Sequence, residues 1–336
     1  MRNPIIIVGA GPAGLACLSV LHRLGVDCPV VLCDVRDTHL DQTRLHEASQ
    51  GERAIEMPLD EIAHCFSARY EQVRVDLGNG ILREADSTGT LRIGNRSEAF
   101  SALVIASGSA PRPPAPSAGR DVKGLRENAQ VTIHPDHPLL IVGGGPSAIQ
   151  YAAQISETHA VRVVTSGSRI LEALPQCISA YAHDFLADRG VDVETNQRVE
   201  GAVPDGSLWL AGLQRDPELY ANRFGQIRIG NAYAHRIFGA GDCCEFDGDG
   251  LNTLSAQSAI RKGKLVGRNI LRQQQGRFML PYDYSERGYI VSLGDDDAVG
   301  WVGSKKAMVT GRAAVAAKAT VDEQYRLLLK GIDTFI

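Results

Sequence analysis

The first sixteen residues carry the pattern that most constrains the fold. Four β-branched residues, Ile5 to Val8, predict a buried strand, and an apolar helix-forming run begins after the next turn. Between them, Gly9, Gly11 and Gly14 stand at the G-x-G-x-x-G spacing. Such glycines allow a tight turn, close approach of a pyrophosphate, and close packing of helix on strand. Because the first helical turn also presents free N–H groups at the positive end of a helix dipole, this stretch predicts a dinucleotide-binding site.

A second strand and a carboxylate follow at the spacing that a dinucleotide site requires. Val30 to Cys33 is apolar, and Asp34 comes about twenty residues after the last glycine. A ribose hydroxyl needs a hydrogen-bond acceptor at this position, so we expect Asp34 to bind a ribose. The alternative that the pattern leaves open is a tight strand–helix turn with no ligand.

The chain repeats this pattern in its middle. Leu139 to Val142 predicts a strand, Gly143 to Ala148 supplies the glycines, and an alanine-rich helix and a strand at 161–165 follow. The proline-rich stretch from Pro111 to Pro116 is stiff and predicts a linker before the repeat. One chain therefore carries two dinucleotide folds, an internal repeat at the scale of a domain.

The size and composition of the chain agree with two domains. It has 336 residues, 44 % of them apolar, and its 35 glycines are typical of an α/β protein with many short turns. We therefore predict two Rossmann-like domains, each a three-layer ββα arrangement, and a small C-terminal α+β region. The expected boundaries are 1–115 with 230–282 for the first domain, 116–229 for the second, and 283–336 for the C-terminal region.

The segments between these motifs predict further strands. Three short alternating runs, 72–77, 80–83 and 90–93, predict a small antiparallel layer inserted in the first domain. Residues 100–106 predict a buried parallel strand. It ends in Ser107-Gly108, where small residues let the backbone contact a ligand.

Charge and cysteine content exclude several classes of protein. A net charge of −4 without a Lys/Arg run gives no reason to expect nucleic acid as a partner. The seven cysteines lack C-x-x-C or zinc-like spacing, so we expect neither a disulfide framework nor a metal site. A redox role for the adjacent Cys243 and Cys244 stays open. The sequence shows no signal-peptide pattern and no apolar run of about eighteen residues, so we expect a cytoplasmic protein.

The order of these motifs resembles that of the FAD-dependent pyridine nucleotide-disulfide oxidoreductase superfamily. Gly9 to Gly14 resembles its FAD-phosphate turn, Ala106-Ser107-Gly108 its second flavin-domain turn, and Gly143 to Ala148 its NAD(P)H turn. Gly241-Asp242 is similar to its Gly-Asp motif, whose aspartate binds the ribityl chain of FAD. The resemblance implies FAD as cofactor and NADPH or NADH as electron donor. The binding residues that it implies are Gly9, Gly11, Pro12, Ala13, Gly14, Asp34, Arg44, Leu82, Ala106, Ser107, Gly108, Gly241 and Asp242 for FAD, and Gly143, Gly145, Pro146, Ser147, Ala148, Gln150, Thr165 and Arg169 for the nicotinamide nucleotide.

Within the superfamily, the chain resembles type II NADH dehydrogenases and the apoptosis-inducing-factor-like quinone reductases. Ala256 to Gly263 is similar to the Ala-Gln-x-Ala-x-x-x-Gly stretch beside the flavin at their quinone side. Leu45 to Ala48 takes the place of their Leu-x-Glu-x segment. The redox C-x-x-C of other subgroups is missing. The resemblance therefore implies direct electron transfer between the flavin and a small-molecule electron acceptor.

Three residues are candidates for catalysis. Gln257 would hydrogen-bond a quinone oxygen or the flavin pyrimidine edge; its alternative role is a polar cap on a buried helix. His46 and Glu47 would move protons to a reduced quinone, and their alternative role is a solvated helix face.

The nicotinamide side departs from the family pattern at three places. Gln150 stands where the family usually has a glutamate, and Thr165 replaces the acid that selects NAD, with Arg169 nearby. Without that carboxylate, NADPH is permitted as well as NADH. Residues 199–210 are also shorter than the usual hairpin. These departures leave open an FAD enzyme with another electron donor, or a flavin-binding sensor module.

The end of the chain predicts two short strands, 289–293 and 298–302, and a closing helix over 309–329. A membrane-docking helix normally has a larger apolar face than this one. We therefore favour packing within the chain, or a dimer contact, over membrane association, and we expect a monomer or a homodimer.

Overall fold

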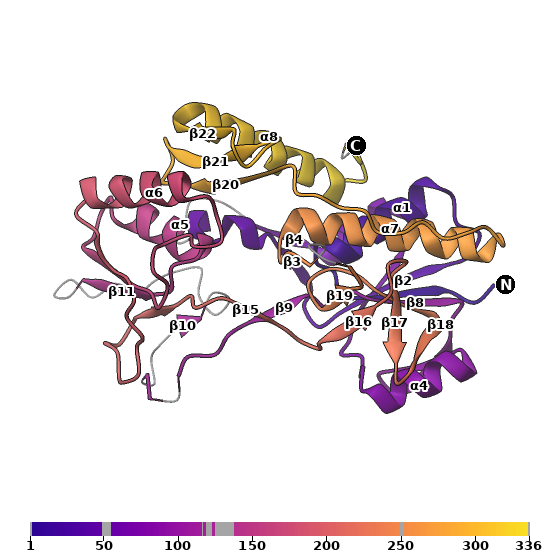
Figure 1. Ribbon diagram of the computed structural model, residues 1–336. Coiled ribbons are helices and arrows are strands. Elements are labelled where there is room, and N and C mark those ends of the chain that lie inside the picture. The colour runs from indigo at the N-terminus through magenta and orange to yellow at the C-terminus, as the bar shows by residue number, and fades with distance from the viewer. Residues whose placement is uncertain are drawn as a thin grey trace.

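The computed structural model describes residues 2–48, 55–115, 117–118, 123–124, 138–248 and 252–334. These residues form two sheets with parallel strands at their centres and a C-terminal region that lies along both (Figure 1). Pro116, the last residue of the predicted linker, lies outside the described residues.

The first sheet has eight strands in the order β19-β16-β17-β18-β8-β1-β2-β5. Their bounds are β1 Ile5–Val8, β2 Val30–Asp34, β5 Arg69–Gln72, β8 Ala102–Ile105, β16 Leu219–Ala221, β17 Gln226–Ile229, β18 Ala232–Gly239 and β19 Cys244–Phe246. Strand β1 is parallel to β2 and β8 and pairs Val8 with Cys33 and Ile105. Its four β-branched side chains are buried, as expected for the central strand of a sheet covered on both faces.

Two helices pack against each other over this sheet: α1 (Pro12–Arg23) and α7 (Ala256–Gln274) (Figure 1). Their approach is close because Gly263 of α7 faces α1, where a Cβ atom would overlap the carbonyl oxygen of Ala13. Apolar side chains of these helices and of the sheet form one continuous cluster, the first core.

The second sheet has five parallel strands. In spatial order they are β10 (Lys123–Gly124), β14 (Leu208–Trp209), β11 (Leu139–Val142), β12 (Val161–Val164) and β13 (Asp192–Glu194). Helices α5 (Pro146–Ile155) and α6 (Gln176–Asp188) pack their apolar faces into a second cluster, the second core. The two Rossmann-like folds that the sequence repeat predicts are therefore confirmed.

Short elements connect and extend the two sheets. Strands β9 (Ser109–Pro111) and β15 (Leu213–Arg215) form an antiparallel pair that lies between the two sheets (Figure 1). The other elements are β3 Thr38–Leu40, the 3₁₀ turn Gln42–Arg44, α2 Leu45–Ala48, β4 Glu56–Pro58, α3 Leu59–Cys65, α4 Asn79–Thr88, β6 Thr90–Ile93 and β7 Arg96–Ala99.

The C-terminal region contributes to both cores. It consists of the strands β20 (Gly288–Ser292), β21 (Ala298–Val302) and β22 (Met308–Thr310), followed by α8 (Gly311–Leu329). Val291 and Trp301 are buried in the second core, whereas Leu328 of α8 is buried in the first. None of the helices in the described ranges is both long enough and apolar enough to span a membrane.

The predicted antiparallel layer between 72 and 93 is largely wrong. Residues 79–88 form the helix α4, which buries Leu82 and Ala85 and ends at Gly89 with a positive φ of 69°. Of the run 72–77 only Gln72 lies in a strand, β5, which joins the parallel sheet, whereas β6 lies in an antiparallel hairpin with β7. An alternation over four residues is too short to distinguish the period of a strand from that of a helix.

Candidate functional site

In the first glycine turn, two glycines lie in close contact with neighbouring backbone and a third faces open space. Gly9 has a φ of +104°, and a Cβ atom on it would overlap the carbonyl oxygen of Ala106. A Cβ atom on Gly14 would overlap the carbonyl oxygen of Gly9, so helix α1 lies directly against the turn. Gly11 has no atom within 4 Å of the same position. The backbone is therefore packed from behind at Gly9 and Gly14 and open to a ligand at Gly11.

Asp34 lies at the edge of this turn. Its Oδ2 atom accepts a hydrogen bond from Ala10 N at 2.7 Å, and its Oδ1 atom accepts one from Arg36 N at 3.0 Å. Each carboxylate oxygen has a further lone pair. The side chain is thus held in place and can still accept a hydrogen bond from a ribose.

A third segment, the Gly-Asp turn after β18, meets the first two. A Cβ atom on Gly241, whose φ is +78°, would lie 2.8 Å from Ala13 Cβ. Asp242 accepts a hydrogen bond from Ser109 Oγ at 3.1 Å, one residue beyond the Ala106-Ser107-Gly108 turn. The structure therefore brings together the turns at 9–14, 106–108 and 241–242, although they are far apart in sequence.

These groups fit the diphosphate and the sugar chains of a flavin dinucleotide. Helix α1 begins at Pro12, and its N-cap, Gly11, has no side chain that could satisfy the N–H groups of the first turn. Such N–H groups and the helix dipole favour an anionic group at the open side of Gly11. Leu82, which the resemblance also implies for FAD binding, does not lie with these groups. It is buried in the first core on α4, on the other side of the sheet from α1 (Figure 1).

Of the predicted residues in α2 and the preceding turn, Arg44 and His46 are buried and Glu47 is half-buried, beside α5 and α8. The Arg44 guanidinium donates to Glu47 Oε2 from Nε at 3.0 Å and from a terminal nitrogen at 2.6 Å. Burial acts to raise the pKa of Glu47, but the hydrogen bond and the charge of Arg44 lower it overall. The structure thus gives Arg44 and Glu47 a shared role in holding this segment. The role of Glu47 in proton transfer stays a prediction.

His46 is buried, with 3 % of its surface exposed, and burial lowers its pKa to about 3. In the unfolded chain this histidine takes up a proton below pH 6.5, whereas the folded protein keeps it neutral. We therefore expect the free energy of unfolding to fall by about 1 kcal/mol between pH 7 and pH 5.5 on account of His46 alone. Urea denaturation at the two pH values measures this change.

Replacement by a neutral side chain tests that expectation. In His46→Asn, the loss of stability between pH 7 and pH 5.5 should be smaller than in the wild type by the same amount. His183→Asn is the control, because the side chain of His183 is half exposed. An unchanged pH dependence in His46→Asn would show that His46 titrates normally in the folded protein.

Gln257 lies in the first turn of α7, close to the Gly-Asp turn. Its Oε1 atom accepts hydrogen bonds from Tyr284 Oη at 2.8 Å and from Arg287 N at 3.1 Å. Because the oxygen already has two donors, a bond from this side chain to a ligand comes from the Nε2 amide. One helical turn further, burial and the nearby charge of Arg287 lower the pKa of Arg261. The guanidinium groups of Arg261 and Arg287 therefore lie close enough to interact, and Arg261 is one helical turn from Gln257.

The second glycine turn repeats the geometry of the first. A Cβ atom on Gly143, whose φ is +137°, would overlap the carbonyl oxygen of Leu210, as Gly9 does with Ala106. Gly145 precedes α5 and, like Gly11, has no atom within 4 Å of its Cβ position. Of the other predicted residues, Pro146 and Ser147 begin α5, Ala148 is buried, and Gln150 is half buried.

This repetition identifies a turn that the sequence analysis missed. Leu210-Ala211-Gly212 packs behind Gly143 in the same way that Ala106-Ser107-Gly108 packs behind Gly9. Gly212 has a positive φ of 104°, and Gly108 has one of 84°. The signal in the sequence was weak, because only Ala211 and Gly212 of this turn are small residues. The preceding strand, β14, is only two residues long.

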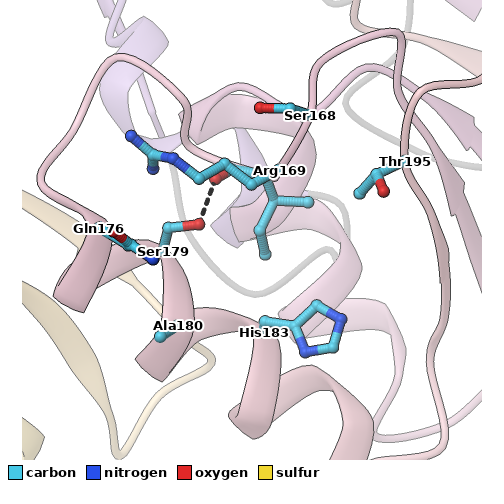
Figure 2. Close-up of a pocket in the computed structure, with 8 residues that line it drawn as sticks. Ser168, Arg169, Gln176, Ser179, Ala180, His183 and Thr195 are labelled. Atoms are coloured by element: carbon cyan, nitrogen blue, oxygen red, sulfur yellow. Dashed lines mark hydrogen bonds between the residues drawn. The ribbon is translucent and has the colours of Figure 1, made fainter.

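A pocket of about 270 Å³ lies past the end of β12 (Figure 2). It is lined by Ser168, Arg169, Ile170, Gln176, Ser179, Ala180, His183 and Thr195. The guanidinium of Arg169 points away from His183 and Thr195 and donates to the carbonyl oxygens of Leu171, Glu172 and Leu174. Arg169 thus holds its own loop rather than offering a free cation to a 2′-phosphate.

Thr165, which takes the place of the NAD-selecting acid, is buried beside the second turn. Its Oγ1 atom accepts a hydrogen bond from Gly167 N at 3.2 Å. A Cβ atom on Gly144 would lie 2.6 Å from the same Oγ1 atom. The threonine therefore packs under the glycine turn.

Known proteins are similar to this chain in sequence or in fold. The Staphylococcus aureus type II NADH:quinone oxidoreductase (strain NCTC 8325 / PS 47) is 24 % identical to the chain, with 98 % of this chain and 97 % of that protein covered. The structure of NDH2 from Plasmodium falciparum in complex with NADH superposes with a TM-score of 0.80 at 13 % identity, covering 98 % of this chain and 96 % of that one.

The sulfide:quinone oxidoreductase of Aquifex aeolicus also shares the fold. Its structure superposes with a TM-score of 0.79 at 15 % identity, covering 98 % of this chain and 92 % of that one. Residues 3–221 of the chain match the family described as pyridine nucleotide-disulphide oxidoreductase. That match includes both glycine turns and more than half of the chain, so the protein is an oxidoreductase that belongs to the pyridine nucleotide-disulphide oxidoreductase family.

Proposed function

We propose that the protein is an FAD-dependent enzyme that oxidises NADH or NADPH and reduces a quinone-like or other small acceptor, without a redox disulfide. The observation that carries the proposal is the repeated turn, open at Gly11 and again at Gly145. Members of the family bind FAD and use NADH or NADPH. Two open dinucleotide turns in one chain are what such a pair of nucleotides requires.

The first turn is the proposed FAD site. The N–H groups at the start of α1 would hold the diphosphate, Asp34 the adenosine ribose, and Asp242 the ribityl chain. When bound, FAD supplies the chemistry of hydride acceptance and of electron transfer to a second substrate.

The second turn is the proposed NAD(P)H site. The start of α5 at Gly145 and Pro146 would hold the diphosphate, and Thr165 lies where the adenosine ribose is expected. Thr165 carries no charge to repel a 2′-phosphate, and Arg169 is engaged by its own loop. We therefore infer that both nucleotides are accepted.

The first turn of α7 is the proposed acceptor side. The Nε2 amide of Gln257 donates a hydrogen bond to an acceptor oxygen, and the guanidinium groups of Arg261 and Arg287 stabilise negative charge that develops there on reduction. Quinone reductases among the relatives support an acceptor of this kind. All seven cysteines are free thiols, and burial raises the pKa of Cys243, which makes it a poor nucleophile.

The test is an anaerobic absorbance titration of the flavin-loaded protein with NADH and NADPH in parallel. We expect bleaching of the flavin within seconds with at least one of them. A protein that takes up no flavin, or a bound flavin that neither nucleotide bleaches, would contradict the proposed function.

A variant at the second turn separates nicotinamide binding from flavin binding. Gly145→Val places a side chain in the open space of the turn at a backbone φ of −81°, which valine adopts without strain. We expect bleaching by NAD(P)H to slow by about a hundredfold or more while FAD content and stability stay unchanged. Gly201→Val, which also meets no neighbour within 4 Å, is the matched control and should behave as the wild type.

One observation favours a second candidate function, an FAD enzyme with a different electron donor. Thr165 is uncharged and Arg169 is hydrogen-bonded to its own loop, so neither side chain offers a charged group to the adenosine end of a nucleotide at the second turn. This alternative predicts that sulfide or thiols bleach the flavin and that NAD(P)H does not.

A flavin-binding sensor module without catalysis is the third alternative. Turnover with a benzoquinone would argue against it.

A further inference from the structure

A buried histidine joins the first glycine turn to the C-terminal helix. His39, on strand β3, has its Nδ1 atom 2.9 Å from the carbonyl oxygen of Ala10 and its Nε2 atom 3.0 Å from the hydroxyl of Tyr325. The exposed fractions are 3 % for His39 and 8 % for Tyr325. Residues 286 positions apart in sequence thus meet beside the backbone of the turn.

The positions of the protons in this chain of bonds follow from the partners. A carbonyl oxygen only accepts, so Nδ1 of His39 carries the hydrogen and donates it to Ala10. Burial lowers the pKa of His39, so the ring is neutral and its Nε2 atom is an acceptor. The hydroxyl of Tyr325 therefore donates to Nε2 and fixes both the tautomer and the orientation of the ring.

These bonds fix one peptide group of the turn. The N–H of Ala10 donates to Asp34, and the carbonyl of Ala10 accepts from His39, so both polar groups of this residue have partners. In a planar trans peptide, the N–H of Gly11 points opposite to the carbonyl of Ala10. His39 therefore sets the direction of the Gly11 N–H, at the position where the turn is open to a ligand.

We propose that His39 and Tyr325 are positioning residues of the FAD site, which hold the Ala10–Gly11 peptide and make cofactor affinity depend on the docking of α8. The inference rests on the proposed function, because it takes the ligand of the first turn to be FAD. A turn whose peptide is already oriented binds its ligand without the cost of ordering that peptide. Loss of either bond therefore weakens binding as well as packing.

Three variants of the full-length chain separate the two bonds. Tyr325→Phe removes only the hydroxyl, His39→Asn keeps a donor near the Nδ1 position but does not reach Tyr325, and His39→Phe removes both bonds. We expect the FAD dissociation constant to rise about three- to tenfold in the first two and by more than about tenfold in His39→Phe. Quenching of FAD fluorescence during titration of the apoprotein measures these constants.

Tyr181→Phe is the matched control. It also removes one tyrosine hydroxyl that ties the C-terminal region, a bond of 2.9 Å to Asp297 Oδ2, but Tyr181 lies on α6, in the second Rossmann-like fold. Its FAD dissociation constant should equal that of the wild type, even where its stability falls.

The outcomes distinguish the inference from the proposed function. Equal FAD affinity in the wild type, Tyr325→Phe and His39→Phe, with only lower stability in the variants, would overturn the inference and leave the function intact. A wild-type protein that binds no FAD would overturn both. Should His39→Phe fail to fold, Tyr325→Phe and His39→Asn decide the question: a rise of about three- to tenfold in the FAD dissociation constant of both supports the inference, and wild-type affinity in both overturns it.

Discussion

Replacing Gly9 with alanine is expected to abolish FAD binding and to destabilise the protein by about 3 to 5 kcal/mol. The φ of Gly9 is +104°, and its Cβ position overlaps the backbone of Ala106. A rigid carbonyl does not move aside as a flexible side chain does, so the turn and β8 must separate. Urea denaturation measures the loss of stability, and the absorbance of the purified protein reports the bound flavin.

Gly25→Ala is the control for backbone strain alone. Gly25 has a φ of +66° but no atom within 4 Å of its Cβ position. We expect it to cost about 1 to 2 kcal/mol, the strain of an L-residue in the left-handed region, with full retention of FAD. If Gly9→Ala and Gly25→Ala changed stability and FAD content equally, the close approach of Gly9 to Ala106 would not account for the effect of Gly9→Ala.

Asp333→Ala is expected to destabilise the protein by about 3 to 5 kcal/mol. Asp333 accepts a hydrogen bond from Lys264 Nζ at 2.6 Å, and the two side chains are each 3 % exposed. Burial lowers the pKa of Lys264, but the carboxylate beside it acts in the opposite direction. Without Asp333, a buried ammonium group on α7 loses the partner that compensates its removal from water. Equilibrium unfolding in urea checks the value.

An apolar replacement of both residues separates the loss of a partner from the loss of the contact. Lys264→Met with Asp333→Leu should return the free energy of unfolding to within about 1 kcal/mol of the wild type. Glu194→Ala, which removes an ion pair with the half-exposed Arg162, should cost less than about 1 kcal/mol. A mild effect of Asp333→Ala, similar to that of Glu194→Ala, would contradict the burial of this pair.

Features encoded by local pattern were predictable from the sequence. Ile5 to Val8 and Leu139 to Val142 are continuous apolar runs, and the glycines after them are spaced for a turn and a helix, so both Rossmann-like folds follow from neighbouring residues. Where the pattern is short, the prediction was unreliable. Residues 90–93 form a strand, β6, as predicted, but residues 80–83 are too short a run to show a period and lie within α4.

Contacts between segments that are far apart in the sequence do not produce a local sequence pattern from which they could be predicted. The turn at Leu210 follows a strand of two residues, which is too short to stand out in a sequence. The position of Asp34 after the second strand follows from the spacing of the motif, but the bond between His39 and Tyr325 does not, because nothing near either residue specifies the other. Such contacts are determined by the packing of α8 on the first core.

The placement of the C-terminal region has a consequence for the order in which the protein is made. Both cores include side chains from residues 288–329, and the first sheet also needs β18, which comes after the whole second sheet. Neither core is complete until these late residues leave the ribosome. A nascent chain therefore exposes two unfinished apolar surfaces until residues 288–329 have left the ribosome and can complete both cores.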